Sequence, residues 1–299
     1  KPDDPWAEKW LLDHSAGTGP YKITEWVRED RVVLTKFDDY WGGWKPGQIE
    51  RVVMKLIREA ATQRMLLEKG DIDVAENIAM EDQMILRGIA GIKDTTSSLY
   101  ASVYVVLFDV TRPPLDDVLV RRAISYAVDY DNHVKLVYGM GKAGTSPIPE
   151  FTKPYWTGKY GYKYDAKKVA ELLDEAGWKL GSDGFRYKAG NKFAISYLYS
   201  TGDEFRRKVG EQLKSDFLKV GISLDVIAEP VTVTTGRLAK GEKPAHLYML
   251  GMYGYGDPSG YLVTTYLQVA FPVWNLGNYK NVRIEELIPK LIQTADVQE

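Results

Sequence analysis

The sequence predicts an α/β protein, in which strands and helices alternate along a chain of 299 residues. Three observations predict this class. Short runs with an apolar residue at every second position recur along the chain and are typical of half-buried strands. Longer stretches with apolar residues three and four positions apart are typical of amphipathic helices. Aspartates before several of these stretches, and glycines after them, are residues that helix ends favour.

The first third of the chain begins with a predicted β-hairpin. The runs Tyr21–Val27 and Arg31–Phe37 alternate in hydropathy on either side of a short polar turn. Val52, Met54 and Leu56 then share one face of a third strand, because successive side chains in a strand point to opposite faces. These runs predict three strands before residue 60.

A helix, a strand and a second helix are expected next. Ala60–Lys69 has the pattern of a helix, and Gly70 closes it because a residue without Cβ accepts the left-handed cap conformation. Asp71–Ala75 is predicted as a strand and Met80–Arg87 as a helix. This alternation indicates an α/β lobe.

The middle of the chain holds the sharpest helical signals. After the strand Tyr104–Phe108 two prolines interrupt regular structure, and we place the junction between two lobes there. Asp116 or Asp117 caps the helix that follows. The buried stripe of this helix comprises Val120, Ala123, Ile124, Ala127 and Val128. Asp165 caps a further helix.

The last part of the chain continues the alternation. Gly177 ends the helix that Asp165 caps, and Ser182–Gly184 marks a turn. The apolar face of the next helix comprises Phe205, Val209, Leu213 and Phe217. Strands Ile222–Ile227 and His246–Leu250 follow, and a final helix is expected over Val282–Glu299.

The composition excludes several classes of protein. The 39 basic and 41 acidic residues give a formal charge of −2, so the chain lacks the basic excess that nucleic-acid binding requires. Apolar residues at 44% and charged residues at 27% are globular values, which excludes wholesale disorder. The chain has no cysteine, so disulfides, thiolate metal sites and cysteine nucleophiles are excluded.

Both ends of the chain are expected to be cut ends of a longer protein. The sequence opens at Lys1 without a methionine or the apolar segment of a signal peptide. The final predicted helix stops at Glu299 without a glycine cap. No apolar run approaches the roughly 20 residues that a membrane-spanning helix needs.

Two motifs have the spacing of cofactor-binding sequences, but the residues around them do not fit such sites. Gly139–Gly144 matches G-x-G-x-x-G, but a helix precedes it and prolines follow, whereas the dinucleotide fingerprint needs a strand before and a helix after. Asp129 and Asp131 have calcium-loop spacing without the required glycine and glutamate, so a helix cap is favoured. The three histidines are far apart in sequence, and neither a metal nor another cofactor is predicted.

One segment favours ligand binding over an ordinary loop. Gly251–Gly260 follows a predicted strand, and ligands of open α/β sheets bind beyond the carboxyl ends of strands. Its glycines allow close approach to the backbone, and its tyrosines offer flat apolar surface with a polar tip. A tryptophan and an amide downstream are expected to line the same cleft. The candidate ligand-binding residues are Gly251, Met252, Tyr253, Tyr255, Asp257, Trp274 and Asn275.

Several stretches, taken in order, resemble one family. Gly17–Tyr21, Tyr40–Gly43, Ile49–Asp73, Asp116–Asp129 and Asp165–Gly177 are similar to successive motifs of extracellular solute-binding family 5. These are the dipeptide-, oligopeptide- and nickel-binding proteins of ABC importers. The resemblance spans nearly all of the chain, although members of the family are considerably longer.

The resemblance implies a fold and a function. The fold is the type II periplasmic-binding-protein fold, a bilobal Venus flytrap, of which this chain is a part. Residues 1–108 would form the second part of lobe I, and 109–299 most of the ligand-closing lobe, domain III. The protein would be a periplasmic, monomeric, non-catalytic receptor. It would bind an oligopeptide-like or other small solute and deliver it to a membrane permease.

The resemblance also carries over to the candidate site. Gly251–Tyr253 matches the strand end where family members offer backbone groups to an extended peptide. Met252 stands where peptide-binding members usually have tryptophan, and the aspartate that pairs with the ligand's ammonium falls on Gly254 or Tyr255. Asp257 matches an Asp-Pro turn and fits a helix cap. This departure argues against peptides with a free amino terminus.

Three alternatives stay open from the sequence. The two tyrosines Tyr253 and Tyr255 suit stacking against a sugar ring, so an oligosaccharide-binding member is one alternative. A hydrolase that uses Asp257 with a second carboxylate is another, and it requires two carboxyl groups about 5–10 Å apart. A periplasmic chaperone or signalling module would retain the fold without transport.

Overall fold

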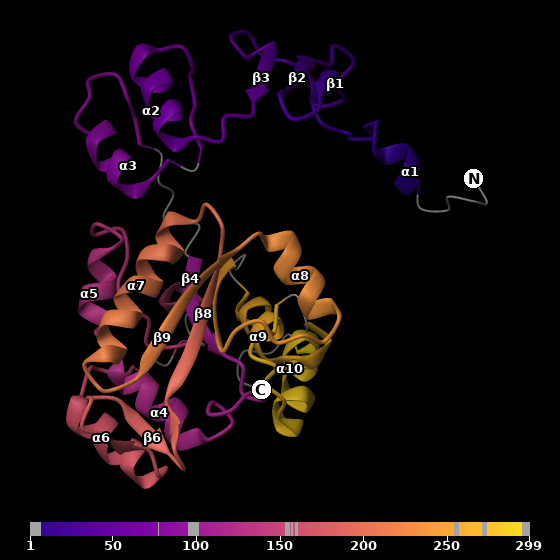
Figure 1. Cartoon of the computed structure of the whole chain (residues 1–299). Helices are drawn as coiled ribbons and strands as arrows, with labels where there is room; N and C mark the ends of the chain where they lie inside the picture. The colour runs from indigo at the N-terminus through magenta and orange to yellow at the C-terminus, as the bar shows by residue number, and fades with distance from the viewer. Residues whose placement is uncertain are drawn as a thin grey trace. The chain divides into compact units, whose positions relative to one another are not determined.

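A computed structural model of the chain describes residues 7–76, 78–94, 102–152, 156, 158, 161–253, 257–270 and 274–294. The chain divides into two compact units, unit 1 (Lys1–Lys93) and unit 2 (Asp94–Glu299). Each unit contains its own sheet, as the ribbon in Figure 1 shows.

Unit 1 contains the predicted hairpin and third strand. Strands β1 (Tyr21–Val27), β2 (Arg31–Lys36) and β3 (Arg51–Lys55) form an antiparallel sheet in the order β1-β2-β3. The hairpin register pairs Trp26 with Val32 and Ile23 with Leu34, with an irregularity between Ile23 and Glu25. The helices of this unit are α1 (Glu8–Leu11), α2 (Ala60–Lys69) and α3 (Met80–Leu86).

The end of α2 confirms one prediction and overturns the next. Gly70 has φ +76°, and its amide and that of Asp71 bond back to the carbonyls of Leu67 and Leu66. This is the Schellman arrangement that a glycine cap allows. The strand predicted at Asp71–Ala75 does not form. The cap consumes the Asp71 amide, and within the described part of unit 1 no strand pairs with these residues.

Unit 2 is built on a four-stranded mixed sheet in the order β4-β10-β8-β9 (Figure 1). Strand β10 runs antiparallel to β4 on one side and parallel to β8 on the other, and β8 is parallel to β9. The strands are β4 (Ser102–Phe108), β8 (Ala194–Ser200), β9 (Ser223–Glu229) and β10 (Leu247–Tyr253). A small separate sheet contains β5 (Lys179–Leu180), β6 (Arg186–Lys188) and β7 (Asn191–Lys192).

Helices cover both faces of the main sheet, because both faces are apolar. The larger core lies under α4 (Val118–Ala127), α6 (Ala166–Glu175) and α7 (Glu204–Leu218). Alternate strand residues point the other way, where Leu198 and Tyr248 meet α8 (Val231–Ala239). Leu250 meets α9 (Pro258–Tyr266) on the same face. Helix α10 (Val282–Gln293) packs on α9, and α5 (Tyr130–Lys135) follows α4.

The predicted caps are present. Asp117 accepts the Leu119 amide at the start of α4, and Asp165 accepts the Lys168 amide at the start of α6. Asp129 caps α5 by accepting the Asn132 amide, in agreement with its interpretation as a helix cap. Among the described residues, no group of three His, Asp or Glu side chains is arranged to hold a metal ion.

The boundary between the units differs from the junction expected after Phe108. The seven residues of β4 all pair with β10, so this strand is part of the unit 2 sheet. The contact-defined boundary falls between Lys93 and Asp94 instead. The prolines that motivated the expected junction lie at a corner after β4, where Pro113 and Pro114 precede α4. The interruption of regular structure at these prolines therefore marks the end of β4.

A buried carboxylate ties α5 to α7. Asp216 is fully buried, and it accepts hydrogen bonds from the Asp129 amide and from the side chains of Gln212 and Lys219. His133 lies 3.2 Å from the same carboxylate. Burial acts to raise the pKa of Asp216, but these hydrogen bonds outweigh burial and keep it below its ordinary value.

One prediction concerns the contact between α7 and β8. A Cβ on Gly210 would lie 2.7 Å from the ring of Tyr197, which is fully buried. We expect Gly210→Ala to lower the free energy of unfolding by about 1–3 kcal/mol, because the ring has no room to move. Gly236→Ala in α8 is the control. Nothing lies within 4 Å of its added methyl group, so this variant should be neutral or slightly stabilised. If urea unfolding shows equal changes in the free energy of unfolding for the two variants, the close packing of Gly210 against Tyr197 is contradicted.

A half-buried histidine directly before β10 contacts Ser196 of β8. The Nδ1 atom of His246 lies 3.0 Å from the Ser196 hydroxyl and 3.1 Å from the Ser196 amide. Burial, with the nearby charge of Arg112, lowers the pKa of His246 from 6.5 to about 4. The folded protein therefore holds this histidine neutral at a pH where the unfolded chain would protonate it.

This depressed pKa predicts a loss of stability in mild acid. As the pH falls below 6.5, the unfolded chain binds the proton first, so the free energy of unfolding decreases until about pH 4. Urea unfolding at pH 7, 5.5 and 4.5 measures this. His246→Gln should flatten the decrease, while His14→Gln, at an exposed histidine of unit 1, should leave it unchanged. If the free energy of unfolding of His246→Gln falls with pH as steeply as that of the wild type, other groups cause the acid destabilisation.

Candidate functional site

The carboxyl ends of the parallel strands of unit 2 meet at one edge of the sheet. In the register of β10 and β4, Gly251 lies opposite Tyr104 and Tyr253 opposite Ser102. Strand β8, parallel to β10, ends at Ser200 on the same edge, and α7 begins just beyond it (Figure 1). Three strand ends and a helix start therefore converge where open α/β sheets bind ligands.

The structure places the first three predicted site residues at this edge. Gly251, Met252 and Tyr253 form the last three residues of β10, so the strand extends into the segment expected to be a loop. Met252 is buried and packs against Tyr261 of α9, and its sulfur lies 2.7 Å from the Thr265 hydroxyl. Its side chain therefore belongs to the core under α9. The prediction for Tyr255 falls outside the described residues.

Asp257 has a local structural role. Its carboxylate accepts the Ser259 amide at 2.8 Å and caps α9, whose first residue is Pro258. Asp257 itself is exposed. Aspartate followed by proline is typical of a helix start, because the cap satisfies a free amide and proline lacks one. The cap interpretation of Asp257 is therefore the one that the geometry supports.

Trp274 and Asn275 lie at the opposite end of the sheet. The carbonyl of Gly277 accepts the Val110 amide, just past the Phe108 end of β4. Residues 102 and 108 are separated by six strand steps, or about 20 Å. The structure therefore does not bring these two residues to the strand-end edge.

Asn275 and Trp274 also differ in how deeply they are buried. Asn275 is fully buried, and its side-chain amide donates to the carbonyls of Leu267 and Tyr279. Its carbonyl oxygen accepts the Tyr279 amide, so every group of this side chain is used within the turn. Trp274 is 48% exposed. Asn275 holds the turn that presents Trp274 to solvent.

Side chains from β4 and α7, and not Trp274 or Asn275, lie beside the carboxyl end of β10. The rings of Tyr104 and Phe205 meet edge-to-face with centroids 5.2 Å apart. The guanidinium carbon of Arg206 lies 5.9 Å from the Tyr104 ring centroid, and its Nε donates to the Met249 carbonyl of β10. Tyr104 is 38% exposed. An aromatic surface and a cation therefore lie together beside the end of β10.

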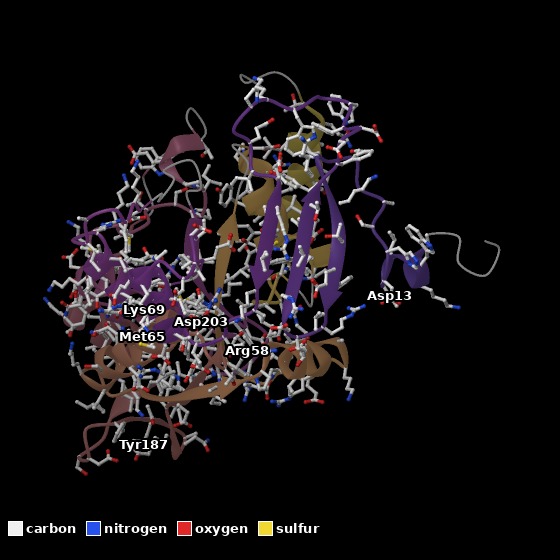
Figure 2. The ribbon with its side chains drawn as sticks, turned by 90° about the horizontal axis from the view of Figure 1, so that it is seen from above. Asp13, Arg58, Met65, Lys69, Tyr187 and Asp203 are labelled. Carbon is white, nitrogen blue, oxygen red and sulfur yellow. The ribbon has the colours of Figure 1, made fainter. Side chains whose placement is uncertain are left out.

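The charges at this edge are paired along the first turn of α7. Asp203 caps the helix by accepting the Arg206 amide, and its second oxygen accepts from the Arg206 guanidinium. Arg207 pairs with Glu204 at 2.9 Å. The Asp203 and Arg206 side chains are only 24% and 26% exposed, so this pair is held in a fixed position. Asp203 is labelled in Figure 2.

These residues are not among the candidate site residues that the sequence predicts. The sequence places Phe205 on the buried face of its helix and Tyr104 in a strand. The available signal was the Asp203-x-x-Arg206 spacing directly after a strand, where a capping aspartate and an arginine one turn later share one helix face. The contact with Tyr104 could not be read from the sequence, because it depends on the β4–β10 register.

The comparisons with known proteins fit this architecture. Residues 1–271 match the sequence model described as "Bacterial extracellular solute-binding proteins, family 5 Middle". The chain belongs to this family. The match confirms the family assignment made from the sequence motifs, and the family is one of extracellular binding proteins.

Two curated relatives of this family 5 chain differ in what their names say they bind. The dipeptide-binding protein of Escherichia coli K12 is 30% identical over 259 residues, which are 84% of this chain and 45% of that protein. Heme-binding protein A of Haemophilus influenzae is 24% identical over 97% of this chain and 51% of that protein. The chain spans about half the length of the curated relatives it matches.

Solved structures confirm the type II periplasmic-binding-protein fold. Helicobacter pylori DppA, a periplasmic binding protein in complex with the peptide STSA, superposes with a TM-score of 0.81 at 22% identity. The match covers all of this chain and 57% of that one. The mannohexaose-bound oligopeptide-binding protein of Thermotoga maritima gives 0.79 at 22% identity, over 98% of this chain and 59% of that one. Within the described residues, no helix has the length and apolarity to cross a bilayer.

The contrast between Asn275 and Trp274 gives a prediction. Removing the buried amide in Asn275→Ala leaves carbonyl and amide groups of the turn without partners, and should lower the free energy of unfolding by about 2–3 kcal/mol. Trp274→Ala, at a half-exposed side chain, should change it by less than about 1 kcal/mol. Thermal and urea unfolding followed by circular dichroism measure both variants. The opposite order would show that the turn is not held by Asn275.

Proposed function

We propose that this chain is part of the substrate-binding component of an ABC importer. The component binds a small solute reversibly in the periplasm and delivers it unchanged to a membrane permease. Family membership supports the class of function, and the strand-end edge of unit 2 supports the place of binding. The solute is oligopeptide-like or another small molecule, and the protein works as a monomer without a cofactor.

The single observation that carries this proposal is the juxtaposition of Tyr104, Phe205 and Arg206 beside the end of β10. An aromatic surface gives contact area at a low cost in conformational entropy, and a positioned guanidinium gives orientation. These three side chains, beside Gly251 of β10, form the wall of the proposed site. Reversible binding of a solute at this wall requires no catalytic group.

The two units correspond to parts of two lobes in this proposal. Unit 1 contributes to lobe I, and unit 2 forms most of the ligand-closing lobe. A solute that contacts both lobes stabilises the closed form, because that form gains contacts that the open form lacks. Micromolar affinity requires about −8 kcal/mol, which a few aromatic contacts and hydrogen bonds supply.

A solute-binding role accounts for the site better than hydrolysis does. The hydrolase alternative depends on Asp257, whose carboxylate is used in capping α9. The relatives reported above are binding proteins by name. An oligosaccharide stays the second candidate solute, because the aromatic wall at Tyr104 suits a sugar ring and one superposed relative was solved with mannohexaose.

The proposal is tested with the full-length protein. Native mass spectrometry identifies any solute that co-purifies, and calorimetry then measures its affinity. Arg206→Ala should weaken binding at least about tenfold, because it removes a fixed donor from the wall. Arg283→Ala, at an exposed arginine of α10, is the matched control and should bind like the wild type. Conversion of the bound solute into a product, or equal affinity in both variants, would contradict the proposal.

A further inference from the structure

We infer that one face of the unit 1 sheet is covered, in the full-length protein, by a segment of the same polypeptide outside residues 1–299. The inference concerns the sheet of β1, β2 and β3 (Figure 1) and does not depend on the solute site of unit 2. It follows from the distribution of apolar side chains on this sheet, from their exposure, and from the length of a protein with the same fold.

The two faces of this sheet differ in polarity. The register aligns residues across the three strands in rungs, and successive rungs point to opposite faces. One face has two rungs of apolar side chains, with Tyr21 and Lys36 paired at its end: Ile23, Leu34 and Val52, and then Trp26, Val32 and Met54. The opposite face has a charged residue in every three-residue rung, among them Glu25, Arg31, Arg51 and Lys55. This pattern is typical of an antiparallel sheet with one face on a core and one in solvent.

The apolar face is largely uncovered among the described residues. Ile23, Trp26 and Met54 are exposed. Arg28 lies over the Trp26 ring, 3.9 Å from its centroid, but the residue is still 43% exposed. None of the hydrophobic clusters that the described residues form includes a residue of this sheet. Since a sheet with an apolar face must bury that face against another element, a covering segment is required.

A hollow at one end of the apolar face has room for an inserted side chain. Its lining includes Trp26, Met54 and Leu56, and its volume is about 150 Å³. The charged residues at this hollow, Asp30 and Arg31, pair with each other. A space of this size accommodates one aromatic ring or one branched apolar side chain. The covering segment therefore presents an apolar residue here.

Chain length and chemistry identify the occupant. Helicobacter pylori DppA superposes over all of this chain, but the match covers only 57% of DppA. A protein of this fold therefore has a large further part that is available to cover the sheet. Apolar rungs without charge are typical of a permanent core, whereas transient partners meet at surfaces about as polar as the rest of the protein. Unit 2 buries the faces of its own sheet against its own helices, so we assign the cover to a segment outside residues 1–299.

Two neighbouring residues of β3 form a matched pair for the test. Met54 lies on the apolar face and is 55% exposed, whereas Val53 lies on the opposite face and is 48% exposed. In the full-length protein, p-benzoylphenylalanine replaces Met54 in one variant and Val53 in another. Irradiation links this residue to the groups in contact with it, and mass spectrometry identifies the linked peptide.

We expect position 54 to link to a peptide of the same molecule outside residues 1–299, at a yield several times that of position 53. A link to a second copy, seen as a covalent dimer, would overturn the inference. So would a link within residues 1–299, or equal yields from the two positions. Each of these results leaves the proposed function of unit 2 standing, because the solute site is not involved.

Aspartate at the same two positions should affect thermal stability differently. Met54→Asp places a charge in the covered interface and should lower the melting temperature of the full-length protein by about 5 °C or more. Val53→Asp places the same charge on the solvent face and should lower it by less than about 2 °C. Equal decreases would show that the face of Met54 is open to solvent and would overturn the inference. If Met54→Asp does not fold, the crosslinking result decides.

Discussion

Unit 2 depends on the mixed pairing of one strand. Strand β10 lies between β4, which runs antiparallel to it, and β8, which runs parallel. This pairing brings the carboxyl ends of two strands and the amino end of a third to the same edge. It also places Gly251, which has no side chain, opposite Tyr104. The candidate site is a consequence of this register, because a shift of one residue would move Tyr104 to the other face of the sheet.

The two cores keep that register in place. Side chains that alternate along β8 and β10 enter different clusters, one under α7 and one under α8 and α9. Both faces are therefore buried, and any slip would expose apolar residues on both sides. Gly210 allows α7 to approach the Tyr197 ring closely, and the start of α7 sets the position of Arg206. Packing in the middle of the sheet thus controls geometry at its edge.

Buried polar groups in unit 2 have structural partners. The Asp216 carboxylate joins α5 to α7, His246 joins β10 to β8, and Asn275 holds the turn after α9. Each of these side chains is bonded to a backbone group; Asp216 and Asn275 are fully buried and His246 is half-buried. The Asp203–Arg206 pair differs, because it is partly exposed at the strand-end edge and has an open Nη2 group among the described residues. Partial exposure and unused bonding capacity distinguish a binding group from a structural one.

The sequence by itself determined the local elements and the family. Helix caps such as Asp117, Asp165 and Gly70 depend on residues within one turn, so spacing alone predicts them. Only the tertiary structure decided that β4 belongs to unit 2, that Asp71–Ala75 forms no strand, and that Trp274 and Asn275 lie near the Phe108 end of β4. It also decided which side chains stand beside Tyr104. These outcomes depend on pairing between residues far apart in the chain, and no local pattern encodes a partner at that distance.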